Sequence, residues 1–277
     1  MKPVFRSLCY LVLATNACAQ VPVDLSKLPN GVERIDLYLL MGQSNMKGRG
    51  AVPAGQTNNP MIVNMHLDTH EWYEAEHPLH LKSKPDNAGY GPGLDFAQTL
   101  LRQTKGARIA LVPCARGGSA INLWQPGKPL YTNAIYKVQK ALSDAPPGVA
   151  RIKGVLWLQG ESDAVENRHD VYAEKLSTLI QSLRADLKEP ELPFIACTVG
   201  SFNTKPNFPY VKEINDILLS LPKRVPHTAC VDARDLTGHI GDRVHYNTAS
   251  QIAMGKRYAA KLKALATPSV PGALSNE

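Results

Sequence analysis

Three residues of the chain have the side chains that nucleophilic acyl transfer requires. Ser44 follows an apolar run over residues 35–41, which is typical of a buried β-strand. Asp242 and His245 are three residues apart, so a turn can bring the carboxylate against the imidazole. The carboxylate then fixes the tautomer of the histidine, which can take a proton from a serine hydroxyl. Each feature taken alone also fits an ordinary polar turn, because such side chains often bond their own backbone.

The same chemistry needs hydrogen-bond donors for the negative oxygen that develops on a carbonyl group. The backbone N–H of Ser44 is one candidate. Gly117 and Gly118 follow a second apolar run, and without side chains they allow close approach to their N–H groups. Gln159 ends a third apolar run and carries a side-chain amide. A glycine turn or a polar strand end explains each of these singly, but together with the Ser, Asp and His they predict one converging site.

The elements that must position these residues alternate along the chain. Strands are predicted at 35–41, 108–114, 154–158, 194–199 and 228–231. Helices are predicted at 94–102, 130–143, 171–187, 211–221 and 250–266. This alternation predicts an α/β fold in which helices cover both faces of a parallel sheet, a three-layer α/β/α sandwich. Ligands bind at the carboxyl ends of the strands in such folds, which is where the candidate residues are expected.

A long segment between the first strand and the first helix has no clear helical period. Residues 51–90 are rich in Pro, Asn and His, and residues 61–75 could form a hairpin. A stretch of this length without regular structure is usually functional or an insertion at the rim of a site. Its histidines, at positions 66, 70, 77 and 80, do not have the spacing of a recognised zinc site. We therefore expect no metal ion, and a serine mechanism needs no cofactor.

The N-terminus has the pattern of a secretory signal peptide. Lys2 and Arg6 precede a short apolar run, and Ala17-Cys18-Ala19 has the small residues of a cleavage site. The run is too short to span a membrane. We predict a signal peptide over 1–19, a single domain over 20–267 and a flexible tail over 268–277, with the protein secreted or periplasmic.

The charge of the chain does not indicate nucleic acid as a partner. The formal net charge is +7, but the Lys and Arg residues are scattered and form no dense basic run or nucleic-acid motif. Three cysteines remain after the leader: Cys114, Cys197 and Cys230. An exported protein permits disulfides, and three cysteines allow at most one internal bridge. Each lies in an apolar run, so a small buried hydrophobe is the interpretation we favour.

Four blocks of the sequence together resemble the SGNH hydrolase superfamily. They are Gly-Gln-Ser-Asn-Met at 42–46, Pro-Cys-Ala-Arg-Gly-Gly-Ser-Ala-Ile at 113–121, Trp-Leu-Gln-Gly-Glu-Ser-Asp at 157–163 and Asp-Arg-Val-His at 242–245. More narrowly, the chain is similar to the sialate O-acetylesterase and acetylxylan esterase branch, the sixth carbohydrate esterase family. The likeness extends from about Ile35 to about Ala264, with the blocks in the family's order.

The resemblance implies a flavodoxin-like parallel sheet of about five strands and a role for each motif residue. Ser44 would be the nucleophile, His245 the general base and Asp242 its orienting acid. Ser44, Gly117, Gly118 and Gln159 would form the oxyanion hole. The wider superfamily has an asparagine where this chain has Gln159, although glutamine is expected in the narrower branch. Arg243-Val244 replaces the more usual Gly-Leu between the acid and the base.

Several neighbouring residues are expected to support or extend this site. Gln43 and Asn45 flank the serine, and Glu161 and Asp163 follow the third strand. Paired carboxylates can cleave glycosidic bonds, but two residues apart at a strand end they are better explained as supports for the adjoining loops. Trp124 could stack on a sugar ring or pack as a buried or rim side chain.

The sequence thus predicts a secreted serine esterase that removes O-acetyl groups from carbohydrate. The favoured substrate is acetylated xylan or a related plant polysaccharide, through an acyl-enzyme. One alternative is a sialate O-acetylesterase or another small-ester hydrolase. Another is a glycan-binding relic without turnover, against which the intact Ser, Asp and His set argues. We expect no nucleic-acid partner and no membrane span, and the oligomeric state is left open.

Overall fold

The computed structural model describes residues 20–266 except 85, 166, 204–205 and 207. The predicted signal peptide and tail lie outside the described residues. The described chain contains one eight-stranded sheet with the order β1-β4-β3-β5-β2-β6-β7-β8. Its strands are β1 (Pro22–Val23), β2 (Arg34–Gly42), β3 (Ile62–Met65), β4 (Trp72–Glu74), β5 (Ala107–Pro113), β6 (Ala150–Leu158), β7 (Phe194–Cys197) and β8 (Thr228–Val231).

Strand β2 lies at the centre of the sheet. It pairs in parallel with β5 from Arg34↔Ala107 to Leu40↔Pro113, and with β6 on its other side. All its residues from Ile35 to Gly42 are buried, as expected for a strand covered on both faces. The strands β3, β5, β2, β6, β7 and β8 all run parallel, whereas β4 and β1 pair antiparallel at one edge.

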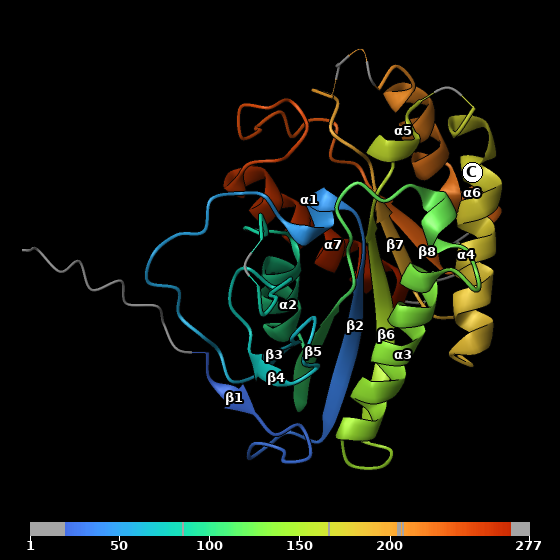
Figure 1. Ribbon diagram of the computed structural model, residues 1–277. Helices are drawn as coiled ribbons and strands as arrows, with labels where there is room; N and C mark the ends of the chain where they lie inside the picture. The colour runs from blue at the N-terminus through green and yellow to red at the C-terminus, as the bar shows by residue number, and fades with distance from the viewer. Residues whose placement is uncertain (1–19, 85, 166, 204–205, 207, 267–277) are drawn as a thin grey trace, which may run out of the picture.

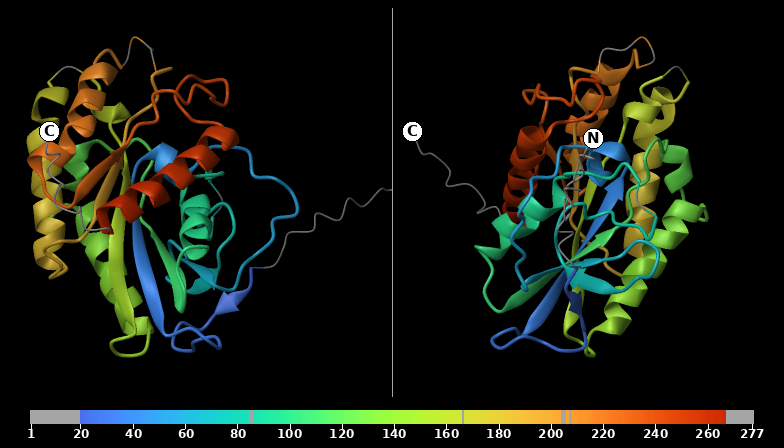
Figure 2. Two further views of the ribbon diagram at one scale, coloured as in Figure 1. Left: turned by 180° about the vertical axis from the view of Figure 1, so that it is seen from behind. Right: turned by 60° about the vertical axis from the view of Figure 1, so that its left-hand side comes forward.

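Helices cover both faces of the sheet, and the side chains of β2 alternate between them. Leu37 and Leu39 pack on the face covered by the third, fourth and fifth helices, whereas Tyr38 and Leu40 pack on the other face. Helices α2 (Gly93–Leu101) and α7 (Thr248–Ala266) lie on that second face and contact each other (Figure 2). The helices are α1 (Ser44–Lys47), α2 (Gly93–Leu101), α3 (Pro129–Asp144), α4 (Tyr172–Asp186), α5 (Val211–Leu219), α6 (Leu221–Arg224) and α7 (Thr248–Ala266). Three short 3₁₀ turns are η1 (Ile121–Trp124), η2 (Glu161–Asp163) and η3 (His169–Val171).

The three-layer α/β/α sandwich predicted from the sequence is confirmed, and the five predicted strands have a flavodoxin-like order. The sheet is larger than about five strands, because the hairpin within 61–75 forms β3 and β4 and β3 pairs with β5. Strands of four and three residues are too short to show a period. The helix predicted at 211–221 ends at Leu219, and α6 begins at Leu221 with proline in its first turn.

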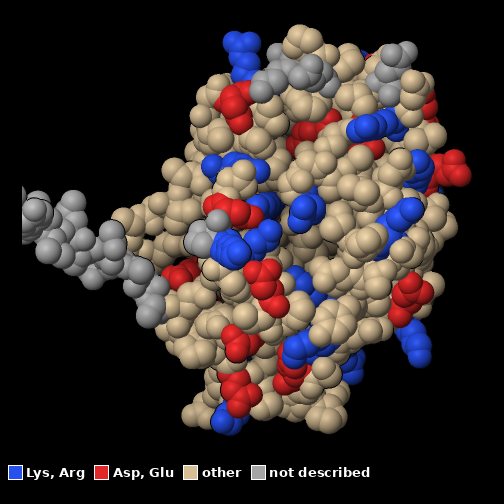
Figure 3. Space-filling model, viewed as in Figure 1, with Lys and Arg blue, Asp and Glu red and all other residues tan. Residues whose placement is uncertain are grey.

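The three cysteines of the described chain are free and buried. Burial raises the pKa of Cys114 to about 11 and that of Cys230 to about 12, so both thiols stay protonated at neutral pH. These cysteines therefore act as small hydrophobes, as the sequence favoured. On the surface, Lys and Arg are interspersed with Asp and Glu on the face shown in Figure 3. Among the described helices, none is long and apolar enough to cross a bilayer.

Candidate active site

Ser44 is placed by a glycine turn at the carboxyl end of the central strand. In Figure 1, β2 runs up to α1, whose first residue is Ser44. Gly42 has a φ of +130°, and a Cβ there would lie only 2.1 Å from the carbonyl oxygen of Leu158. Only glycine can pass so close to β6 with this backbone angle. The serine therefore emerges at the centre of the sheet edge where α/β folds bind ligands.

A loop before α7 brings the acid and the base to this serine. The Oγ of Ser44 lies 2.9 Å from Nε2 of His245. The Nδ1 of His245 lies 2.5 Å from Oδ2 of Asp242. The other carboxylate oxygen of Asp242 accepts the backbone N–H groups of Val244 and His245, both at 2.9 Å. The three side chains that the sequence singled out therefore form one continuous chain of hydrogen bonds.

The backbone of the turn between Asp242 and His245 explains why related proteins usually have glycine at the position of Arg243. Arg243 has a φ of +56°, in the left-handed region that glycine adopts without strain. The Arg243 side chain is exposed, so the larger residue meets no steric obstacle in the turn. The replacement of Gly by Arg thus changes the cost of the turn but leaves Asp242 and His245 in contact.

The hydrogen bonds around Asp242 keep its carboxylate ionised. Partial burial acts to raise the pKa of Asp242, but hydrogen bonds from His245 and Val244 outweigh it and lower the pKa to about 2. An ionised carboxylate can only accept a hydrogen bond, so Nδ1 of His245 carries the proton. The Nε2 atom is then left as an acceptor for the Ser44 hydroxyl. This is the arrangement of a general base beside a nucleophile.

Gly117 lies directly beside Ser44, in a turn that follows β5. A Cβ on Gly117 would be 3.9 Å from the Cβ of Ser44. The turn over residues 114–119, which we call the Gly117 turn, is tied to the serine strand because the N–H of Arg116 donates to the carbonyl of Gly42 at 2.9 Å. Gly118 has a φ of +70° and open space at its Cβ position. Gly117 is thus the better placed of the two to present an N–H to a carbonyl bound at Ser44.

The side-chain amide of Gln159, which the sequence predicts as an oxyanion donor, is hydrogen-bonded to other protein groups in this structure. Its side chain is fully buried, and its Nε2 donates to Asp163 Oδ2 at 2.5 Å and to the carbonyl of Ser119 at 3.0 Å. The same nitrogen lies 3.2 Å from Oε1 of Gln43. An amide nitrogen has two hydrogens, and protein acceptors occupy both. These bonds tie the carbonyl of Ser119 to the carboxylate of Asp163, so Gln159 braces the Gly117 turn against η2.

Asn45 and Glu161 connect the serine helix to the loop of the histidine. The Nδ2 of Asn45 donates to Oε1 of Glu161 at 2.5 Å and to the carbonyl of Val244 at 3.0 Å. The Oδ1 of Asn45 accepts the N–H of Tyr246 at 3.0 Å. Burial raises the pKa of Glu161, although the hydrogen bond from Asn45 opposes this. These contacts agree with the supporting role expected for Asn45 and Glu161. Because Glu161 is bound to Asn45, it is explained as a support and not as one carboxylate of a glycosidase pair.

Gln43 and Asp163 join the same support. Oε1 of Gln43 accepts the N–H of Ser162 at 3.3 Å, in addition to its contact with Gln159. Oδ2 of Asp163 accepts the N–H of Ile121 at 2.8 Å, and burial raises the pKa of this carboxyl group. The two side chains therefore tie η2 to the serine turn on one side and to η1 on the other.

Trp124 is not a platform for sugar. Its side chain is fully buried, packs edge-to-face on Trp157 at 5.5 Å and donates from Nε1 to Oγ of Ser119 at 2.9 Å. It lies in η1, which turns the indole inward. Of the two interpretations open from the sequence, the packing one is correct, and its hydrogen bond secures the end of the Gly117 turn.

Arg49 belongs to this site, although the sequence reasoning missed it. One of its terminal nitrogens lies 3.5 Å from the Cβ position of Gly117, and the other donates to the carbonyl of Asn87 at 2.9 Å. The flanking glycines hold it there, because a Cβ at Gly48 or Gly50 would overlap backbone or side-chain atoms within 2.8 Å. A cation between two glycines, shortly after the serine, is the signal that could have indicated it.

The histidines of the insertion are placed separately and for different purposes. His66 accepts the N–H groups of Asp68 and Thr69 through Nδ1, at 3.2 and 3.1 Å. His77 and His80 are buried, and burial lowers the pKa of each to about 3. The described residues contain no group of three His, Cys, Asp or Glu side chains arranged to hold a metal ion.

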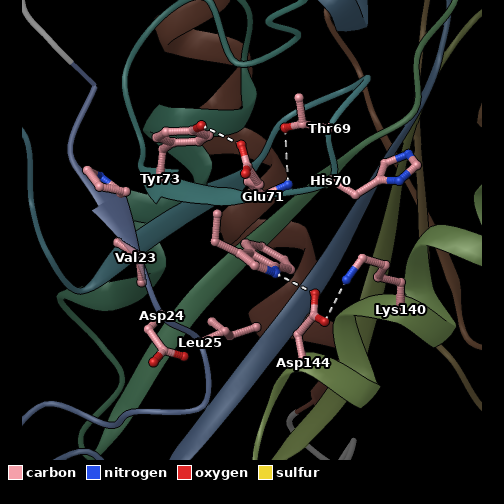
Figure 4. Close-up of a pocket in the computed structure, with 11 residues that line it drawn as sticks. Val23, Asp24, Leu25, Thr69, His70, Glu71, Tyr73, Lys140 and Asp144 are labelled. Atoms are coloured by element: carbon pink, nitrogen blue, oxygen red, sulfur yellow. Dashed lines mark hydrogen bonds and ion pairs between the residues drawn. The ribbon is translucent and has the colours of Figure 1, made fainter.

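A cleft of about 590 Å³ opens at the far edge of the sheet, next to β1 and β4 (Figure 4). Its polar side chains are engaged with one another: Trp72 Nε1 and Lys140 Nζ both bind the carboxylate of Asp144, at 2.9 and 2.7 Å. Tyr73 donates to Glu71 at 2.8 Å. The cleft shares no residue with the Ser44 site, so we do not assign the chemistry to it.

Comparisons with known proteins agree with this geometry. Residues 34–264 match the family model "Carbohydrate esterase, sialic acid-specific acetylesterase". A probable carbohydrate esterase of Arabidopsis thaliana is 32% identical over 252 residues, which cover 84% of this chain and 92% of the relative. A crystal structure from the same plant superposes with a TM-score of 0.74 at 31% identity, covering 83% of this chain and 98% of that one.

Two bacterial proteins are more distantly similar. A probable 9-O-acetyl-N-acetylneuraminic acid deacetylase of Escherichia coli K12 is 25% identical over 173 residues, which cover 53% of this chain and 52% of the relative. A carbohydrate acetylesterase from Xanthomonas citri has a TM-score of 0.62 at 22% identity, with 83% of this chain and 56% of that one covered. These findings confirm the resemblance carried by the four motif blocks, while the assignment to the sixth carbohydrate esterase family stays a prediction.

Proposed function

Because this chain belongs to the carbohydrate esterase, sialic acid-specific acetylesterase family, we propose that it removes acetyl groups from sugars through an acetyl-Ser44 intermediate. The chain is a carboxylic ester hydrolase, as its family and the named activities of its relatives establish. One observation carries the assignment of roles: the hydrogen-bond chain from Ser44 through His245 to Asp242, with distances of 2.9 and 2.5 Å.

The first half of the proposed reaction forms the acyl-enzyme. Oγ of Ser44 attacks the acetyl carbonyl carbon while Nε2 of His245 takes the hydroxyl proton. The carbonyl oxygen becomes an oxyanion, which the N–H groups of Ser44 and Gly117 bind. The intermediate collapses by breaking the bond to the sugar oxygen, and that oxygen takes the proton from His245. Asp242 stabilises the imidazolium throughout, because its low pKa keeps the carboxylate negative.

The second half releases acetate. A water molecule gives a proton to Nε2 of His245 and attacks the carbonyl carbon of acetyl-Ser44. The second oxyanion is bound by the same N–H groups. When it collapses, the bond from the carbonyl carbon to Oγ of Ser44 breaks, and Oγ takes the proton from Nε2 of His245. Acetate leaves, and the hydrogen bond between Ser44 and His245 forms again. No step requires a metal ion or an organic cofactor.

For the substrate we propose acetylated xylan or a related plant polysaccharide, supported by the resemblance of the motif blocks to acetylxylan esterases. The signal-peptide pattern at 1–19 supports action outside the cytoplasm, in the periplasm or the medium. A second candidate is an O-acetylated sialic acid. The Arg49 guanidinium beside Gly117 favours it, because a sialic acid carries a carboxylate.

A substrate panel tests the proposal and separates its two forms. Acetate release by the protein without residues 1–19 is measured on acetylated xylan, on 9-O-acetyl sialic acid and on 4-nitrophenyl acetate, beside Ser44→Ala. The proposal predicts release from xylan that the variant loses. Release from sialic acid alone moves the assignment to the second candidate. A wild-type protein that binds glycan but hydrolyses none of the three would be a relic and would contradict the proposal.

A further inference from the structure

His80 brings the insertion at 51–90 into contact with the Gly117 turn. Its Nε2 accepts the backbone N–H of Ala115 at 3.1 Å, and its side chain is 1% exposed. Ala115 is itself buried and lies two residues before Gly117. A hydrogen bond to this N–H therefore fixes the backbone just ahead of the group that is proposed to bind the oxyanion.

The surroundings of His80 keep it in the form that can accept this bond. Because Nε2 accepts, Nδ1 carries the proton. Burial is the largest cause that lowers the pKa of His80, and together with the charges of Lys137 and Lys47 and a smaller contribution from His77 it brings the pKa to about 3. Only Asp86 acts in the opposite direction. The imidazole is therefore neutral at neutral pH.

A second side chain, from helix α3, binds the same stretch of backbone. Lys137 of α3 is 1% exposed, and its Nζ donates to the carbonyl of Pro113 at 3.1 Å. Lys137 and His80 thus bind the two residues on either side of Cys114. Beyond Gly117, Ser119 is held by Trp124 and Gln159. The Gly117 turn is bound by side chains before and after the glycine.

We propose that His80 is a positioning residue for the esterase reaction: through the Ala115 N–H it sets the place of the Gly117 N–H against the carbonyl bound at Ser44. The inference rests on the proposed function. It also gives the insertion at 51–90 a purpose. Among the described residues, the bond between His80 and Ala115 is the insertion's one side-chain hydrogen bond to the Gly117 turn. An apolar side chain at position 80 would leave the buried Ala115 N–H without an acceptor, and the turn would shift to satisfy it.

Three variants test this role. His80→Leu removes the acceptor, whereas His80→Gln keeps one at about the position of Nε2. His66→Leu is the matched control, because His66 is also buried in the insertion and also accepts backbone N–H groups, but not from the Gly117 turn. Steady-state rates on 4-nitrophenyl acetate are divided by the number of active sites, counted as the endpoint of fluorophosphonate labelling. Thermal melts report the stability of each variant.

The inference predicts that kcat falls by roughly tenfold to a hundredfold in His80→Leu while KM changes little, since a small displacement of a catalytic group costs this much. His80→Gln restores most of kcat, and His66→Leu keeps it. Equal kcat in His80→Leu and the control, or a loss that glutamine does not rescue, would overturn the inference. If His80→Leu does not fold, the shorter His80→Asn replaces it, and equal kcat in the Gln and Asn variants overturns the inference. A wild-type protein without Ser44-dependent activity would instead remove the proposed function itself.

Discussion

Oδ1 of Asn45 accepts the backbone N–H of Tyr246 at 3.0 Å, so the residue after Ser44 is bound to the residue after His245. The same side chain donates to Val244 and to Glu161. One buried amide therefore sets the distance between the nucleophile and the base, whose elements are separated by most of the sequence. Catalysis depends on such distances, because a group displaced by about 1 Å can lose roughly a hundredfold in rate.

Replacing Asn45 is expected to affect activity and stability together. In Asn45→Ala, Glu161 loses the donor that Asn45 supplies and the N–H of Tyr246 loses its acceptor, and each such loss at a buried group costs about 1–3 kcal/mol. The kcat on 4-nitrophenyl acetate should fall by at least about tenfold. Denaturant unfolding and steady-state kinetics measure the two effects. Asn122→Ala, at an exposed position, is the control and should match the wild type.

The acid sensitivity of the fold should depend on Asp242. Its pKa of about 2 lies below the ordinary aspartate value of 3.8, so the folded state favours the ionised form. The stabilisation from this group is complete above about pH 4 and is lost as the pH falls through 2. Asp242→Asn removes this dependence and should lower kcat by about 10⁴, because the tautomer of His245 is no longer fixed. Unfolding curves from pH 6 to pH 2 compare the two proteins. A difference in unfolding free energy between wild type and Asp242→Asn that stays the same across that range contradicts the prediction.

Two roles for Gln159, a structural brace and an oxyanion donor, predict different effects of its replacement. Because Gln159 braces Asp163, Gln159→Ala should destabilise the fold by about 1–3 kcal/mol, since the buried carboxylate loses one of its two donors and keeps only the N–H of Ile121. The double variant with Asp163→Ala should then be less destabilised than the sum of the two single changes. Chemical unfolding of the four proteins measures this coupling. An additive result, with kcat lowered about 10²–10³-fold by Gln159→Ala alone, would return Gln159 to the oxyanion hole.

Arg49 should affect charged substrates more than neutral ones. A charge-assisted hydrogen bond contributes about 1.5–3 kcal/mol, or roughly tenfold to a hundredfold in kcat/KM. Arg49→Met should therefore lose that factor on 9-O-acetyl sialic acid if this sugar is a substrate, and lose little on 4-nitrophenyl acetate. Arg116→Met is the comparison, because Arg116 is also near Gly117 but is exposed. Equal losses on both esters would mean that Arg49 acts on the acetyl group and not on the sugar.

The sequence predicts the parts of this molecule that depend on local pattern and chain order. Ser44, Gly117 and the Asp242–His245 turn each follow a strand or precede the last helix, and parallel strands bring their carboxyl ends to one edge. The direction of a side chain at that edge depends on partners elsewhere in the fold. Gln159 binds Asp163 and Trp124 binds Ser119, and no periodic pattern in the sequence indicates either contact.

The insertion shows the same limit. Strand β3 joins the sheet because β5 offers it a free edge, which four residues alone cannot indicate. Arg49 reaches the site because Gly48 packs against the backbone of Gly89, Tyr90 and Gly91. Such close backbone contacts are decided by the tertiary fold, so composition and spacing could suggest a functional loop but not its purpose.

Covalent labelling of Ser44 tests the central claim most directly. The protein is treated with a fluorophosphonate, and its peptides are analysed by mass spectrometry, beside Ser44→Ala and His245→Ala. The hydrogen bond between Ser44 and His245 predicts a single label on Ser44, absent in the first variant and formed far more slowly in the second. A wild-type protein that stays unlabelled, or that carries its label on another serine, would contradict the account.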